Sequence, residues 1–160
     1  MVGDPCDPTF LERVFQGKDV VVSTLGGKAP TKASTSVFYR SAEAIVEAAQ
    51  VTGLKRVLVT STALLFPPRS LWDRLLIMMV PHTVRSAQQM EDVLKGSELS
   101  WTIARCGFLN NNEICEYRAE VDSLPKKGSF IARAGLASFL LDTMEQFDAV
   151  RRVFGVSRPA

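Results

Sequence analysis

The segment from Lys55 to Thr62 is the feature of this sequence that most restricts the fold. It reads Lys-Arg-Val-Leu-Val-Thr-Ser-Thr, so three aliphatic residues follow a basic pair and run directly into three hydroxyl side chains. An apolar run without polar alternation is typical of a strand buried on both faces, as in parallel sheets covered by helices. The hydroxyl side chains then fall at the carboxyl end of the strand, where open α/β sheets bind ligands.

A second strand and a helix precede this segment. Asp19 to Thr24 reads as another buried-type strand, and the following Leu25-Gly26-Gly27 lets the backbone turn sharply or approach a ligand. The composition of residues Lys28 to Ser36 predicts a loop. Val37 to Val51 has apolar residues at helical spacing, and Gly53 ends that pattern. Together these segments predict a β-α-β crossover with two parallel strands.

The rest of the chain continues the alternation of helices and strands. We therefore expect an α/β fold with a parallel sheet and flanking helices, forming a single domain over residues 1–160. The further predicted elements are a helix from Pro8 to about Phe15 capped by Asp7 or Thr9, helices at Leu71 to Met79 and Val84 to Leu94, a strand at Leu99 to Ala104, a loop from Asn110 to Gly128, a short strand at Ser129 to Ile131, a helix at Ala134 to Met144 and a strand at Arg152 to Val156.

The composition limits the classes of binding partner and the cellular compartment that we expect for this protein. With 160 residues, 46% of them hydrophobic, the chain is long enough to build a core. A formal charge of +2 without a basic stripe points to neither nucleic acid nor a membrane surface. The three cysteines have no CxxC spacing, which argues against disulfides and a zinc site and favours a reducing, cytoplasmic location.

Several motifs, in order along nearly the whole chain, resemble the atypical NAD(P)-binding branch of the short-chain dehydrogenase/reductase superfamily, which includes NmrA-like and flavin-reductase-like proteins. The resemblance implies a Rossmann-type fold and a small-molecule substrate or dinucleotide as partner. The matching pieces are Gly3-Asp4, Gly17 to Gly26, Ala48-Ala49, Gly53 to Thr62, Glu91-x-x-Leu94, Trp101-Thr102-Ile103-x-Arg105-x-Gly107, Ile131 to Leu140 and Val156-Ser157-Arg158.

The resemblance also implies a binding site for NADP or NAD. The acceptor carbonyl would be held during hydride transfer by Thr62 and Ser61, which face the nicotinamide in this comparison. Asp4 would contact the adenine ring. The other implied cofactor-binding residues are Thr24, Leu25 and Gly26 on the adenosine and pyrophosphate side, and Cys106, Gly107 and Phe108 at the far edge of the nicotinamide.

Two features of the family are absent from this sequence. The glycine-rich loop that holds the pyrophosphate is missing, so we interpret the chain as a truncated relative that begins after that β-α-β unit. The acid pair Tyr-x-x-x-Lys is also missing, and Ala87 stands where the Lys is usual. Without the first unit, the strand at Asp19 to Thr24 becomes an exposed edge through which the chain is expected to self-associate.

The residues leave several alternatives open. Ser61 and Thr62 either contact a ligand or form a cap or strand-end turn, and Asp4 either contacts adenine or forms an Asx turn. Cys106 reads as a small buried hydrophobe rather than a nucleophile. The Leu71 to Met79 segment reads as core or as a substrate lid, and His82 as a solvated or capping residue or a base. Two functions follow: an NAD(P)-dependent reductase of a small carbonyl or quinone-like compound, or a non-catalytic dinucleotide sensor or interaction module.

Overall fold

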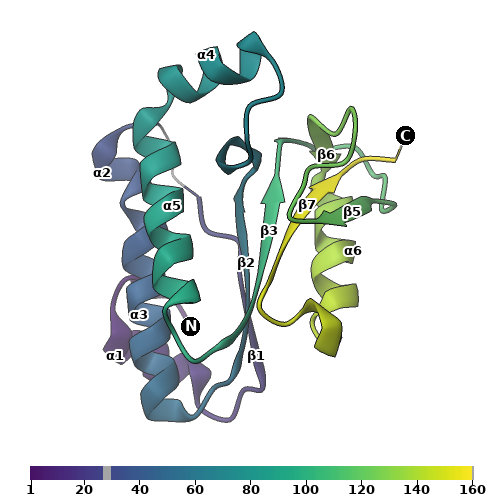
Figure 1. The fold of residues 1–160 in the computed structure, drawn as a ribbon. Helices are drawn as coiled ribbons and strands as arrows, with labels where there is room; N and C mark the ends of the chain where they lie inside the picture. Colours follow the sequence, from purple (N-terminus) through teal and green to yellow (C-terminus); the bar gives the residue numbers. More distant parts are fainter. Residues whose placement is uncertain (27–29, 160) are drawn as a thin grey trace.

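The computed structural model describes residues 1–26 and 30–159 and shows a five-stranded sheet between two layers of helices (Figure 1). The strand order is β1-β2-β3-β7-β5, and a separate pair is formed by β4 and β6. In chain order the elements are α1 (Pro8–Phe15), β1 (Val20–Ser23), α2 (Lys32–Thr35), α3 (Val37–Thr52), β2 (Arg56–Thr62), the 3-10 helix η1 (Ala63–Leu65), α4 (Leu71–Met79), α5 (Pro81–Lys95), β3 (Ser100–Cys106), β4 (Phe108–Asn110), β5 (Arg118–Val121), β6 (Phe130–Ala132), α6 (Arg133–Thr143), the 3-10 helix η2 (Phe147–Ala149) and β7 (Arg152–Ser157).

The predicted α/β architecture is confirmed. Strands β1, β2, β3 and β7 are parallel to one another, and β5 pairs with β7 in the antiparallel sense. Helices α3 and α5 cover one face of the sheet, with α1 packed on α3, while α6 covers the other face (Figure 1). Apolar side chains of the sheet form a core cluster with each helical layer.

The segment chosen from the sequence as the central strand is β2, which pairs with β1 on one side and β3 on the other. Val57, Leu58 and Val59 are all almost completely buried. Val57 and Val59 pack with α3 and α5, whereas Leu58 packs with α6. Because successive side chains of a strand point to opposite faces, both faces of β2 must be apolar, which explains the unbroken aliphatic run.

Local signals place the start of α1 and the end of α3 where the sequence predicted them. The carboxylate of Asp7 accepts a hydrogen bond from the backbone N–H of Thr9 and caps α1. Gly53 ends α3 with a φ of +77°, a left-handed conformation that favours glycine. The helix predicted at Val84 to Leu94 begins earlier than expected, because Pro81 occupies the first position of α5.

Three expectations for the first half of the chain need correction. The stretch from Lys28 to Ser36 is not all loop, because Thr31 caps the short helix α2; Lys28 lies outside the described residues. β1 is a half-buried edge strand rather than a fully buried one, with Val22 exposed. The core interpretation of the Leu71 to Met79 segment is wrong, because no residue of α4 is buried. Five of its large apolar side chains, including that of Leu75, are exposed.

The C-terminal third contains more strand than the sequence predicted. The expected loop from Asn110 to Gly128 includes β5, which pairs with β7. The expected strand near Ser129 is β6, which pairs in parallel with β4. Leu136, Phe139 and Leu140 of α6 are buried as predicted. No helix among the described residues is long and apolar enough to cross a membrane.

Candidate functional site

Three parallel strands bring the predicted site residues to one edge of the sheet. Residues opposite one another include Ser23 with Val59 and Thr62 with Cys106, so β2 and β3 end at the same level and β1 ends three residues earlier. Because the strands are parallel, their carboxyl ends lie along a single edge. This is the edge at which open α/β sheets bind ligands.

Ser61 lies on the face of the sheet that is covered by α5. It is 6% exposed, and its hydroxyl donates a hydrogen bond of 2.7 Å to Oε1 of Glu91. The side chain of Thr60 lies on the opposite face, beside α6. The hydroxyl proton of Ser61 is therefore already used in a hydrogen bond within the protein.

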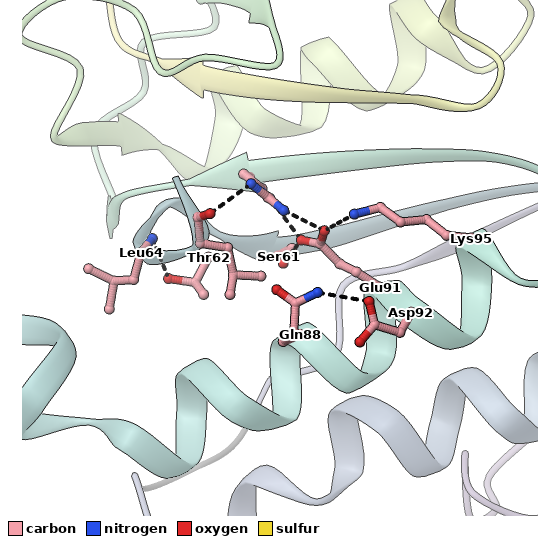
Figure 2. A network of polar contacts seen from close by, with 9 residues as sticks. Ser61, Thr62, Leu64, Gln88, Glu91, Asp92 and Lys95 are labelled. Atoms are coloured by element: carbon pink, nitrogen blue, oxygen red, sulfur yellow. Dashed lines mark hydrogen bonds and ion pairs between the residues drawn. The ribbon is translucent and has the colours of Figure 1, made fainter. Parts of the chain in front are cut away.

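Glu91 is the centre of a buried polar network (Figure 2). Its side chain has no solvent exposure. Arg105 donates from Nε to Oε1 at 2.9 Å and from Nη2 to Oε2 at 2.7 Å, and Lys95 donates to Oε2 at 2.8 Å. Burial alone would raise the pKa of Glu91, but the hydrogen bonds from Arg105, Lys95 and Ser61 together lower it below its ordinary value. Glu91 therefore remains an anion inside the core.

The same network holds the backbone that follows β2. Arg105 also donates from Nη1 to the carbonyl of Leu65 in η1 at 3.0 Å, and its guanidinium lies 4.7 Å from the ring centroid of Phe66. The hydroxyl of Thr62 accepts a hydrogen bond of 3.2 Å from the backbone N–H of Leu64 (Figure 2). Thr62 is thus a cap of η1.

A cavity of about 260 Å³ opens beside the carboxyl ends of β1 and β2. The hydroxyl-bearing residues Thr24 and Thr60 form one side of it, and Arg133, Leu136 and Leu140 of α6 form the other. Gly26 follows closely in sequence; a side chain there would meet no atom within 4 Å, and its φ is not positive. No contact within the described protein therefore requires a glycine at position 26.

Gly107 and Phe108 lie in a second, smaller cavity of about 100 Å³, between η1 and α4. A Cβ at position 107 would lie 2.2 Å from the carbonyl oxygen of Ser129, so the close approach of these two backbones requires glycine. The amide of Phe108 donates to the same carbonyl at 2.8 Å. Gly107 thus has a packing role that is independent of any cofactor.

The other predicted residues are more scattered. Cys106 is buried against the carbonyl of Ser61, and burial raises the pKa of its thiol to about 11, which fits the small buried hydrophobe of the sequence interpretation. Asp4 forms the Asx turn, since its carboxylate accepts from the amide of Cys6 at 2.8 Å. Leu25 is half-buried after β1, and His82 is exposed. No group of three His, Cys, Asp or Glu residues in the described ranges could hold a metal ion.

Sequence reasoning assigned no role to Glu91 and Arg105, although both belong to the motifs that it used. A signal was present in the helix pattern. Ala87, Met90, Glu91 and Leu94 all fall on the buried face of α5, so a carboxylate stands among apolar positions. A charge on such a face requires a partner, but the pattern does not say which residue supplies it.

A comparison with protein-family models matches residues 1–146 to a family described as NAD(P)H-binding. The chain belongs to this NAD(P)H-binding family. The match covers the first three parallel strands and the cavity beside them. A comparison with curated proteins gives no match.

Solved structures with the same fold come from several bacteria. A short-chain dehydrogenase/reductase from Veillonella parvula is 22% identical with a TM-score of 0.80, over 99% of this chain and 71% of that one. A second structure of a short-chain dehydrogenase/reductase from this species, in complex with NADP, is 20% identical with a TM-score of 0.75, over 100% of this chain and 72% of that one. ChuY from Escherichia coli O157:H7, described as an anaerobilin reductase, is 19% identical with a TM-score of 0.73, over 99% and 76%.

The polar groups at the carboxyl edge of this NAD(P)H-binding chain are side-chain hydroxyls. The hydroxyl-bearing residues of the 260 Å³ cavity and the open position of Gly26 suit the sugar and amide groups of a nucleotide. The sequence contains no glycine-rich phosphate loop of the GxxGxxG type.

Proposed function

We propose that this chain binds NADPH or NADH at the carboxyl edge of its sheet and acts as an NAD(P)-dependent oxidoreductase on a small carbonyl or quinone-like compound. The observation that carries the proposal is that Thr24 and Thr60, at the ends of β1 and β2, line one cavity of about 260 Å³. Thr62 follows Thr60 by two residues at the end of β2. Membership of the NAD(P)H-binding family supports the cofactor. The NADP complex of the Veillonella parvula relative supports it further.

In this proposal Thr62 holds the acceptor carbonyl. Its hydroxyl oxygen already accepts a hydrogen bond from Leu64, so its own proton remains available to a substrate oxygen. Ser61 positions Thr62 rather than contacting the substrate, because the Ser61 hydroxyl is bound to Glu91. The bound dinucleotide would supply the hydride. Leu25 and Gly26 would lie beside the adenosine and pyrophosphate. The far edge of the nicotinamide would face Cys106, Gly107 and Phe108.

A second candidate is a non-catalytic dinucleotide sensor, and one observation favours it. The family's Tyr-x-x-x-Lys pair is absent from the sequence, and Ala87, which stands where the Lys is usual in the family, is completely buried. The side chain of Ala87 cannot transfer a proton to a carbonyl oxygen. A sensor would bind NADPH without oxidising it in the presence of any acceptor.

The first test is a calorimetric titration of the purified chain with NADPH and with NADH. Replacing both cavity hydroxyls, in the variant Thr24→Val/Thr60→Val, should weaken binding by about tenfold, because two hydrogen bonds are lost while shape is kept. Thr9→Val, on the exposed surface of α1, is the matched control and should leave the Kd unchanged. Absence of binding at millimolar NADPH would contradict the proposal, as would equal Kd values for all three proteins.

Turnover then separates the two candidates. The oxidation of NADPH is followed by absorbance with a panel of quinones and small aldehydes as acceptors. Steady NADPH consumption that depends on the acceptor supports the oxidoreductase. Tight binding with no consumption above the background rate supports the sensor.

A further inference from the structure

A polar pocket of about 360 Å³ lies away from the carboxyl-edge cavities, between α2, α3 and α5. Figure 1 shows α2 beside the upper parts of α3 and α5. Lys32 comes from α2, Tyr39 from α3, and His82 and Arg85 from α5. None of the hydroxyl residues of the proposed dinucleotide site lines it. Two cationic side chains from separate helices therefore face one hollow.

The charges in this pocket have no counterpart within the described protein. No acidic side chain lines it. None of the ion pairs found among the described residues involves Lys32 or Arg85. By contrast, Lys95 of α5 and Arg105 of β3 are both bound to Glu91. The pocket thus presents two cationic side chains with no acidic side chain among the residues that line it.

The start of α5 adds to the positive potential. His82 is the second residue of this 15-residue helix, and no side chain caps the helix N-terminus at Val80. The unsatisfied N–H groups and the helix dipole at such an end favour an anion. Arg85 offers several N–H donors in one plane, a geometry that matches the oxygens of a phosphate group.

We propose that this pocket, named here the α2/α3/α5 pocket and lined by Lys32, Ser36, Tyr39, His82, Arg85 and Gln89, is a second binding site that takes the phosphate ester of a small polar molecule. Two fixed positive charges match the dianion of a phosphate monoester. The volume exceeds that of phosphate alone and leaves room for a small organic group. This site is separate from the dinucleotide site and does not rest on the proposed function.

The test is an NMR titration of the ¹⁵N-labelled 160-residue chain at low salt, with inorganic phosphate and with glycerol 3-phosphate as probes. We expect saturable shifts of the amides of Ser36, Tyr39 and Gln89, with tighter binding for the ester. The variant Lys32→Gln/Arg85→Gln should weaken binding by about tenfold or more, because two charge-assisted contacts are lost.

The control is Lys18→Gln/Arg152→Gln, which removes two exposed charges elsewhere and should leave the affinity unchanged. Linear, non-saturating shifts would overturn the proposal, as would equal weakening in both double variants. A further arm repeats the titration with NADPH present at saturation. Unchanged binding of glycerol 3-phosphate supports a separate site, whereas displacement of the ester by NADPH overturns it.

Discussion

Glu91 is the residue whose environment differs most from what its chemistry favours. A carboxylate with no solvent exposure is stable here only because Arg105, Lys95 and Ser61 donate hydrogen bonds to both of its oxygens. Since Arg105 also binds the carbonyl of Leu65, the ion pair connects α5 and β3 to the turn that carries Thr62. The ion pair between Glu91 and Arg105 therefore holds the turn at the candidate site in place as well as stabilising the core.

Replacing this carboxylate by an amide, Glu91→Gln, should lower the free energy of unfolding by about 3 kcal/mol, because the guanidinium of Arg105 then stays buried without a counter-charge. Urea denaturation at pH 7 measures the change. Asp92→Asn, at the exposed neighbouring position, is the control and should change stability by no more than about 0.5 kcal/mol. An equal, small effect of both substitutions would contradict the structural role of Glu91.

The same variant makes the pH dependence testable. The pKa of Glu91 is lower in the folded protein than its ordinary value of 4.5, so the folded state holds the proton less readily than the unfolded chain. Its contribution to stability is therefore complete above the unfolded pKa and is lost as the pH falls through the folded pKa. The difference in unfolding free energy between wild type and Glu91→Gln should shrink as the pH falls below that ordinary value.

At the scale of elements, Arg56 explains how α6 is held against the sheet. This side chain is 8% exposed and donates to the carbonyls of Thr143 and Met144, at the end of α6, and to that of Ser100. The last carbonyls of a helix have no partner within it, and a cation there also favours the helix dipole. Arg56 thus terminates α6 from the neighbouring strand β2.

Arg56→Met should destabilise the protein by about 3 kcal/mol, because the three carbonyls lose a charged donor while the side chain keeps a similar apolar stem. Thermal and urea unfolding both report this loss. Lys55→Met is the control, since Lys55 is exposed and adjacent, and a change within about 0.5 kcal/mol is expected there. The role of Arg56 in holding α6 would be refuted by a cost as small as that of the control.

At the scale of the whole molecule, β1 leaves one edge of the sheet open. It pairs only with β2 among the described strands, and Val22 is 41% exposed. A row of unpaired backbone groups flanked by valines is a template for a strand from another molecule. We propose that the chain self-associates through this edge.

The charge substitution Val22→Lys should therefore shift the chain towards the monomer, because a charged side chain on an edge strand opposes pairing between sheets. Size-exclusion chromatography with light scattering over a range of concentrations measures the change in mass. Val51→Lys, at an exposed position near the end of α3, is the control. A wild-type chain that is monomeric and well folded at every concentration would rule out association through β1.

The pattern of neighbouring residues was enough to predict the α/β class, the central strand β2 and the family. A continuous run such as Val57-Leu58-Val59, the capping residue Asp7 and the stop at Gly53 act through contacts within a few residues, so their outcome is visible in the order of the side chains. The NAD(P)H-binding family was likewise predicted from short motifs, several of them at the ends of strands.

Only the tertiary structure decided which polar residues meet. Glu91 and Arg105 lie on different elements, as do Lys32 and Arg85, and nothing in the local pattern of either pair says whether they come together. The apolar pattern of α4 left core and substrate lid open as alternatives, and no element of the described structure covers its exposed apolar side chains. Pairing and burial of this kind depend on the arrangement of distant segments, which hydrophobic periodicity does not encode.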